Sequence, residues 1–209
     1  MQEARHLIVI LAGPNGAGKS TFYEEFLSSL SLPFINADRL AFDQLGRPAN
    51  TDDEALAAAK QAEIRRHALI KAKDSFIFET VLSDSKGAKI DFLRKAQARG
   101  YYIEAYFIGL SDPMLSQARV IQRVDIGGHD VPDEKLAARF PRTLENLRRL
   151  IDVADHLTLL DNSEADNPFC KIAVFERGQL RAYVPKPPAW IEFLDLPSRQ
   201  LPNTQILPE

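Results

Sequence analysis

Residues 13–21 read Gly13-Pro14-Asn15-Gly16-Ala17-Gly18-Lys19-Ser20-Thr21 and fit the pattern G-x-x-x-x-G-K-[ST] at every position. In this pattern a strand ends, the backbone wraps around an anion, and a helix begins near the lysine. The glycines let the backbone approach phosphate oxygens, Lys19 reaches the β- and γ-phosphates, and the Ser20 hydroxyl ligates Mg²⁺. The apolar run 7–12 before the motif and the amphipathic pattern after it (Phe22, Phe26, Leu27, Leu30) favour a nucleotide-binding P-loop over a chance match.

Length, charge and cysteine content limit what else the chain can be. Its 209 residues suit one α/β domain with a small appendage. Lys and Arg number 26 against 29 Asp and Glu, so the net charge of −3 creates no field that would recruit nucleic acid. The apolar run 7–12 is too short for a signal peptide or a membrane span. The single Cys170, which we expect to be buried in its apolar run, suits a reducing compartment, so we expect a cytoplasmic protein.

Alternating strand and helix patterns predict an α/β fold with a mostly parallel sheet. The expected strands are 7–12, 33–36, 75–78, 101–110 and 156–161, with helices at 19–30, from 37, at 52–73, at 90–98, and after 112 and 133. Pro141 should kink or break the last of these helices. Residues 171–175 and 180–184 flank a turn and predict a C-terminal β-hairpin.

The chain divides into a main domain and a tail. We expect residues 1–184 to form the P-loop domain. The Pro-rich residues 185–209 should be extended and should pack back on the domain through four apolar side chains (Trp190, Ile191, Phe193, Leu194).

Three polar residues follow strands that should end beside the P-loop. In open α/β sheets ligands gather beyond the carboxyl ends of the strands, where the pattern places Asp38, Glu79 and Thr80. Asp38 can act as a general base on an acceptor hydroxyl, or it can be the N-cap of the next helix. Glu79 ends a buried strand, where an unpaired charge is costly. It should therefore meet a ligand, a metal-bound water or an arginine, or form a structural ion pair.

Two arginine-bearing helices around a Gly-Gly joint, at about 112–142, resemble a lid over a nucleotide. Arg123 and Arg139 are the candidates for neutralising charge on a transferred phosphoryl group, and two neighbours are the alternatives (Arg119, Arg142). These arginines can instead form a solvated helix face. His129 has no partner at metal-ligand spacing, so we expect it to order the loop by a hydrogen bond.

Taken in order, these motifs resemble the zeta-toxin family of P-loop kinases, and its compact bacterial members in particular. The matching pieces are GPNGAGKST (13–21), FINADRL (34–40), FIFETVLS (76–83), RVIQRVDIGGHDVP (119–132) and RFPRTLENL (139–147). The P-loop alone is shared by many unrelated ATPases, whereas F-E-T followed by R-V-x-x-G-G-H-x-V-P is much more specific. The resemblance implies a doubly wound, three-layer α/β fold with a lid.

The resemblance also implies phosphorylation of a sugar hydroxyl with ATP and Mg²⁺, and the acceptor of characterised relatives is UDP-N-acetylglucosamine. It makes Lys19 and Ser20 the phosphate and metal contacts and Asp38 the base. Glu79 and Thr80 then orient the acceptor, and Arg123 and Arg139 are the lid arginines. An antitoxin protein that covers the nucleotide site is an implied partner.

Two alternatives to this function stay open. Residues 46–75 do not clearly match the uridine and sugar contacts of the family, so the acceptor can also be a nucleoside or a free sugar. A nucleotide-driven ATPase or switch is the alternative from another class. The sequence argues against it, because it contains neither an L-S-G-G-Q signature nor an N-K-x-D guanine motif.

Overall fold

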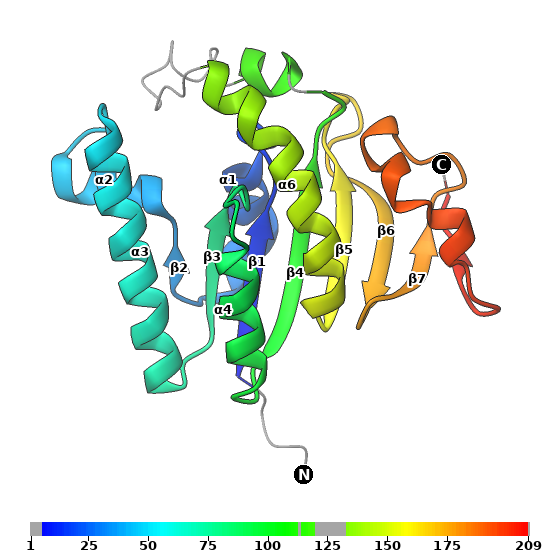
Figure 1. Ribbon diagram of the computed structural model, residues 1–209, viewed down its shortest axis with the longest axis horizontal. Coiled ribbons are helices and arrows are strands. Elements are labelled where there is room, and N and C mark those ends of the chain that lie inside the picture. The colour runs from blue at the N-terminus through cyan, green and yellow to red at the C-terminus, as the bar shows by residue number, and fades with distance from the viewer. Residues whose placement is uncertain (1–5, 113, 120–132, 209) are drawn as a thin grey trace.

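The computed structural model describes residues 6–112, 114–119 and 133–208 of the chain. These residues form one eight-stranded sheet in the order β2-β3-β1-β4-β5-β6-β7-β8 (Figure 1). The strands are β1 (Leu7–Ala12), β2 (Phe34–Ile35), β3 (Phe76–Thr80), β4 (Tyr102–Gly109), β5 (His156–Asp161), β6 (Cys170–Glu176), β7 (Gln179–Tyr183) and β8 (Gln205–Ile206). The first five pair in parallel, β6 pairs antiparallel with β5 and β7, and β8 is parallel to β7. The predicted mostly parallel sheet and its hairpin are confirmed.

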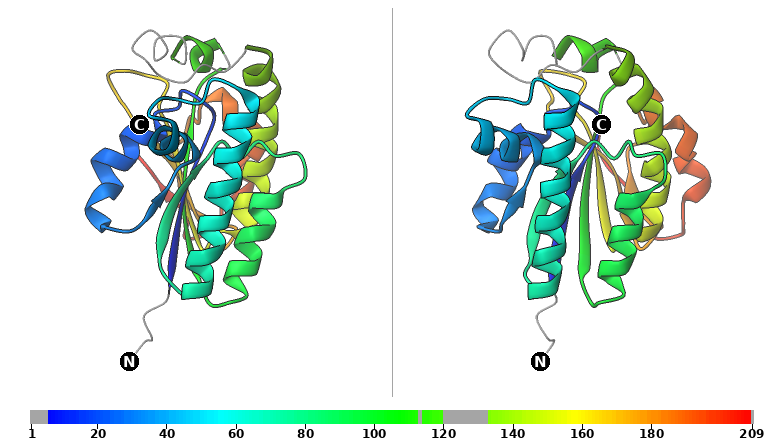
Figure 2. Two further views of the ribbon diagram at one scale, coloured as in Figure 1. Left: turned by 90° about the vertical axis from the view of Figure 1, so that its left-hand side faces the viewer. Right: turned by 60° about the vertical axis from the view of Figure 1, so that its left-hand side comes forward.

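Helices cover both faces of this sheet, which gives three layers. They are α1 (Lys19–Phe22), continued by η1 (Tyr23–Leu27) and η2 (Ser28–Leu30), then α2 (Ala37–Leu45), α3 (Asp52–Ala72), α4 (Ala88–Gln97), α6 (Asp133–Val153), η3 (Ala189–Leu194) and η4 (Leu196–Arg199). Residues 114–119 are also helical. Helices α3, α4 and α6 lie on one face, and the segment from α1 to η2 lies on the other (Figure 2). Among the described residues no helix is long and apolar enough to cross a membrane.

Strand β1 is apolar throughout because both of its faces are buried. Ile8 and Ile10 belong to the larger core cluster, on the side of α3, α4 and α6. Val9 and Leu11 point the other way, into the cluster that contains Phe22 of α1. Alternate residues of a strand face opposite sides, so a central strand needs an unbroken apolar run.

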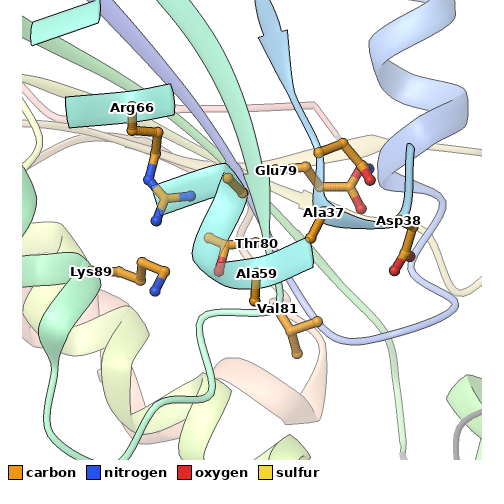
Figure 3. A pocket seen from close by; sticks show the side chains of 10 residues that line it. Ala37, Asp38, Ala59, Arg66, Glu79, Thr80, Val81 and Lys89 are labelled. Carbon is orange, nitrogen blue, oxygen red and sulfur yellow. The ribbon is translucent and has the colours of Figure 1, made fainter. Parts of the chain in front are cut away.

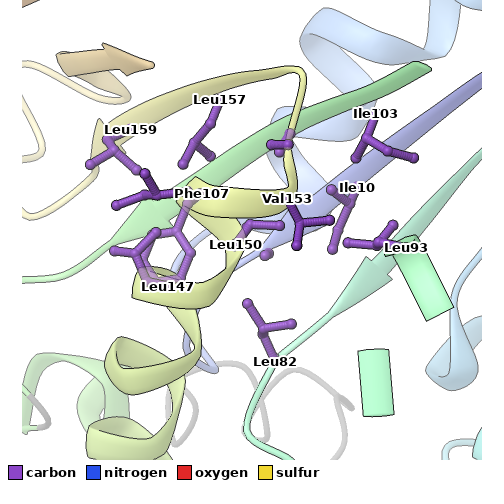
Figure 4. Packing of buried hydrophobic residues seen from close by; sticks show 14 of the residues in the cluster. Ile10, Leu82, Leu93, Ile103, Phe107, Leu147, Leu150, Val153, Leu157 and Leu159 are labelled. Carbon is purple, nitrogen blue, oxygen red and sulfur yellow. The ribbon is translucent and has the colours of Figure 1, made fainter. Parts of the chain in front are cut away.

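Helix α6 closes the larger cluster over β4 and β5. Leu147, Leu150 and Val153 point at these strands (Figure 4). The helix continues through Pro141, so of the two predicted outcomes, a kink or a break, the break is wrong. A proline costs the helix one donor, but the apolar side chains that follow it (Leu144, Leu147, Leu150, Ile151) pack on the core and stabilise the helix.

Three local expectations need correction. The helical segment 19–30 has the predicted extent, but it combines α, π and 3-10 turns, and Phe26 and Leu30 are 53% and 46% exposed. Strand β3 spans Phe76–Thr80 and not 75–78, and Glu79 and Thr80 are its last residues, at the expected carboxyl end. Cys170 is partly exposed, although its apolar neighbours suggested a buried thiol.

The C-terminal tail is folded and not extended. It forms η3, η4 and β8, and Trp190, Ile191 and Leu194 are buried in the larger cluster. The Trp190 ring stacks on Phe107 at a centroid distance of 5.8 Å, and its Nε1 donates to Asp161 Oδ1 at 2.9 Å. A Cβ on Gly109 would lie 2.1 Å from this ring, so the glycine makes room for it.

Trp190→Ala should therefore lower the free energy of unfolding by about 3–5 kcal/mol, the usual cost of removing a buried tryptophan. Urea unfolding followed by circular dichroism measures this, because Trp190 is the only tryptophan and its fluorescence disappears with it. Trp190→Phe is the matched control and should lose less, since it keeps a ring against Phe107. A loss below about 1 kcal/mol for the alanine variant would mean that the tail does not stabilise the sheet.

Candidate active site

The P-loop connects the carboxyl end of β1 to α1. Gly13 has a φ of +143°, and a Cβ there would lie 2.1 Å from the carbonyl oxygen of Ile108, so glycine is required where the loop passes β4. Gly18 has a left-handed φ of 85° and precedes Lys19, and no side chain caps the helix that begins there. The first N–H groups and the positive end of the helix are therefore directed to an anion. Strand, loop and helix follow each other as the motif predicts.

Lys19 and Ser20 both contact Glu79. The Lys19 side chain is 6% exposed, and its Nζ donates to the carbonyl oxygens of Gly13 at 3.0 Å and Pro14 at 2.9 Å. The same Nζ lies 3.8 Å from Glu79 Oε1, and Ser20 Oγ donates to Glu79 Oε2 at 3.2 Å. The cation that Glu79 meets is thus a lysine, whereas the sequence suggested a ligand, a metal-bound water or an arginine. The contact between Lys19 and Glu79 is an ion pair, which was the alternative considered for Glu79.

Asn36 joins the carboxylate of Glu79 to helix α2. Its Nδ2 donates to Glu79 Oε2 at 2.8 Å, and its Oδ1 accepts the backbone N–H of Arg39 at 3.0 Å. Asn36 is therefore the N-cap of α2, and the alternative that Asp38 caps this helix is wrong. Asp38 is exposed in the first turn of α2, and its carboxylate does not cap the helix.

A cavity of about 160 Å³ opens between α2, α3, β3 and α4 (Figure 3). We call it the acceptor pocket, and its lining is Asn36, Ala37, Asp38, Ala59, Ala62, Arg66, Glu79, Thr80, Val81 and Lys89. Figure 3 shows Asp38 and Glu79 toward one side, Arg66 and Lys89 toward the other, and Thr80 between them. The three residues chosen at the strand ends, Asp38, Glu79 and Thr80, therefore line one cavity.

The two cations of the acceptor pocket were not predicted from the sequence. Arg66 is only 4% exposed, and burial lowers its pKa, with Glu63 opposing the shift. Burial also lowers the pKa of Lys89, and the charge of Arg66 adds to this, while Asp84 and Glu63 act the other way. One signal was available. Arg66 continues the buried stripe of α3 at spacing i, i+4, where every other member is apolar (Ala58, Ala62, Ile70).

Two polar side chains from distant segments bond the P-loop, and a third bonds the segment that carries one of them. Ser116 Oγ donates to the carbonyl oxygen of Asn15 at 2.6 Å, and Asn162 Nδ2 donates to that of Ala17 at 2.9 Å. Arg119 donates to the carbonyl oxygens of Asn162 at 2.7 Å and Ser163 at 3.4 Å. Sequence reasoning missed Ser116 and Asn162, and it had Arg119 only as a reserve lid arginine. The one available signal was that all three follow the carboxyl ends of β4 and β5.

The structure separates the two arginine candidates on α6. Thr143 Oγ1 donates to the carbonyl oxygens of Val81, at the end of β3, and of Arg139, both at 3.0 Å. Residues i and i+4 share a helix face, so Arg139 lies on the face turned to the β3 end of the sheet. The Arg142 guanidinium is exposed and donates to Ala138 of its own helix at 2.9 Å. Arg123 and His129, with the rest of 120–132, lie outside the described residues.

The described residues fit a nucleotide with a metal ion at the P-loop. Their His, Cys, Asp and Glu side chains form no group of three or more that could hold a metal on its own. The metal contact expected here is the Ser20 hydroxyl, with phosphate oxygens as the remaining ligands. The uncapped helix and the lysine at its first turn suit that assignment.

Comparisons with known proteins identify relatives of this chain. An uncharacterized protein of Haemophilus influenzae is 27% identical over 132 residues, which cover 63% of this chain and 91% of that protein. A crystal structure of AvrRxo1-ORF1:-ORF2 with ATP is similar at a TM-score of 0.67 and 16% identity, over 99% of this chain and 67% of that chain. In a second structure of that pair, with sulphate ions, the similarity covers 64% of the other chain.

The PezAT chromosomal toxin-antitoxin system of Streptococcus pneumoniae is similar at a TM-score of 0.56 and 15% identity, over 83% of this chain and 72% of that chain. At such identities these structures establish the fold and nothing more. The family model described as Zeta toxin, in contrast, matches residues 1–167, a range that contains the P-loop, the acceptor pocket and helix α6. This chain therefore belongs to the zeta toxin family.

Proposed function

We propose that this protein is a small-molecule kinase that transfers the γ-phosphoryl group of ATP to a sugar hydroxyl, and that UDP-N-acetylglucosamine or a related nucleotide sugar is the acceptor. The observation that carries this proposal is the position of Glu79. One carboxylate contacts Lys19 and Ser20 of the P-loop and also lines the acceptor pocket. A phosphate donor and a hydroxyl acceptor would therefore meet at this residue.

Each side chain of the site has a different role in such a transfer. Bound ATP with Mg²⁺ supplies the phosphoryl group. Lys19 would bind its phosphates, and Ser20 would ligate the metal. Asp38, on the first turn of α2, accepts the proton of the acceptor hydroxyl while that oxygen forms its bond to the γ-phosphorus, the bond from this phosphorus to the bridging oxygen breaks, and ADP leaves. Asn36 keeps Asp38 and Glu79 in register, because it caps the helix of one and bonds the carboxylate of the other.

Charge on the transferred group needs a cation from outside the P-loop. Among the residues that the structure describes, Arg139 is the candidate for this cation, since its face of α6 turns to the end of β3. Arg123 is proposed from the resemblance alone. Arg119 already bonds the loop after β5, so its contribution is to hold the segment that carries Asn162, which in turn bonds the P-loop.

The acceptor pocket favours a kinase over an ATP-driven switch or a water-activating ATPase. Hydrolysis needs one water molecule, which requires about 10–15 Å³ of cavity on the same measure by which this cavity has about 160 Å³. A nucleoside or a free sugar is the runner-up acceptor. An antitoxin protein is a proposed partner, motivated by the family and by the PezAT toxin-antitoxin system among the structural relatives.

Mass spectrometry of a nucleotide-sugar mixture, incubated with ATP, Mg²⁺ and the purified protein, tests the proposal. We expect a gain of one phosphate on UDP-N-acetylglucosamine with the wild type and none with Asp38→Asn. A gain on a different compound would keep the kinase and change the acceptor. Steady ATP hydrolysis with no phosphorylated product from a broad panel of alcohols would contradict a kinase.

A further inference from the structure

We propose that Arg66 and Lys89 form a subsite for a phosphate group that the acceptor molecule already carries. The subsite lies at the end of the acceptor pocket opposite Asp38 (Figure 3). This inference rests on the proposed kinase function and names the class of acceptor: an alcohol that is also a phosphate or diphosphate ester.

The first argument is that Arg66 is buried without an anionic partner. Its side chain is 4% exposed, and its Nε finds no hydrogen-bond acceptor in the described part of the chain. The contacts of its guanidinium are the ring faces of Phe78 and Phe92, at 5.2 and 5.6 Å. Cation–π contacts recover only part of what a guanidinium loses when it leaves water. A buried arginine that faces a cavity in this way is suited to an anion that enters the cavity.

The second argument is that another cation shares the cavity. Lys89, in the first turn of α4, lines the same pocket, and its pKa is lowered by burial and by the charge of Arg66. Glu63 and Asp84 are the carboxylates whose charges oppose the lowering of these pKa values. Within the described residues neither forms an ion pair with Arg66 or Lys89, and Glu63 Oε1 lies 3.9 Å from His67 Nε2. Two like charges facing one space repel each other, and an anion between them removes that cost.

The third argument is the separation of charge along the pocket. Asp38 and Glu79 repel an anion from the end beside the P-loop, while Arg66 and Lys89 attract it to the other end (Figure 3). An acceptor with a phosphate at one end would thus bind in one direction, with a hydroxyl toward Asp38. A guanidinium and an ammonium together match a phosphate with two negative charges better than a single carboxylate.

The subsite is tested by binding, separately from turnover. The full-length protein is first saturated with a non-hydrolysable ATP analogue and Mg²⁺, so that the P-loop is occupied. Inorganic phosphate is then titrated in phosphate-free buffer, and the melting temperature reports binding. We expect Arg66→Met and Lys89→Met to weaken phosphate binding at least about tenfold, the scale of one charge-assisted hydrogen bond.

Matched controls lie close by in the chain: Arg65 is the neighbour of Arg66 on α3, and Lys86 lies in the turn before α4. Arg65→Met and Lys86→Met remove exposed cations nearby and should change phosphate binding less than about twofold. Arg66→Lys should restore part of the affinity, and it shows whether a loss in Arg66→Met comes from charge or from packing on the phenylalanines. If phosphate leaves the wild-type melting temperature unchanged, or binds equally to Arg66→Met and Arg65→Met, the subsite does not exist.

Kinetics with a matched acceptor pair separate the two proposals. N-acetylglucosamine 1-phosphate should have a lower KM than N-acetylglucosamine with the wild type, and Arg66→Met should remove that preference through KM while kcat is kept. Equal use of both acceptors by the wild type would overturn the subsite and leave the kinase intact. Phosphate binding that depends on Arg66, without transfer to any acceptor, would leave the subsite and overturn the kinase.

Discussion

Lys19→Ala is expected to lower the rate of phosphoryl transfer by on the order of 10²- to 10³-fold, the usual effect of removing a preorganised charged donor from a reacting group. Two consequences of the substitution act together. The cation that binds the phosphates is lost, and the carboxylate of Glu79, only 13% exposed, loses the cation 3.8 Å away from it. The uncompensated carboxylate then repels the phosphates of an incoming nucleotide.

Measurement of kcat with saturating acceptor, together with the Kd of an ATP analogue, separates the two consequences. Lys60→Ala is the control, since Lys60 is an exposed lysine of α3. Melting temperatures identify any loss caused by unfolding, which has to be considered because Lys19 also bonds the carbonyl oxygens of Gly13 and Pro14. If Lys19→Ala transfers phosphate at the wild-type rate, the P-loop is not the nucleotide site.

Asp38→Asn should lower kcat by roughly 10²–10⁴, the contribution of a positioned general base. The amide has the shape of the carboxylate but cannot accept the proton of the acceptor hydroxyl. Because Asn36 and not Asp38 caps α2, the substitution should leave the melting temperature and the nucleotide Kd unchanged. A fall in kcat with unchanged stability therefore distinguishes a base from a structural carboxylate.

Asp43→Asn is the matched control for this prediction, because Asp43 is an exposed aspartate on the same helix. It should behave like the wild type. A normal kcat for Asp38→Asn would contradict the assignment and move the search for the base to Glu79, the other carboxylate of the acceptor pocket.

Much of the fold follows from local patterns in the sequence. The P-loop geometry is determined by residues 13–21, because glycine spacing and a following helix are local properties. The buried strand β1 follows from its unbroken apolar run, and the hairpin of β6 and β7 from two β segments around a short turn. Asp38, Glu79 and Thr80 could be selected from the sequence, because parallel strands end at one edge of the sheet.

The tertiary structure decided which partners these residues have. Only the folded chain brings Glu79 to Lys19, assigns the cap of α2 to Asn36, and places Arg66 and Lys89 in one cavity. It also placed Trp190 against Phe107, so that the tail is part of the core. These contacts join segments far apart in the chain, and side-chain periodicity indicates only which face is buried, not what it packs against. The sequence by itself therefore determined the P-loop and the strand ends beside it, while the packing of distant elements decided which partners their polar residues have and which cations share their cavity.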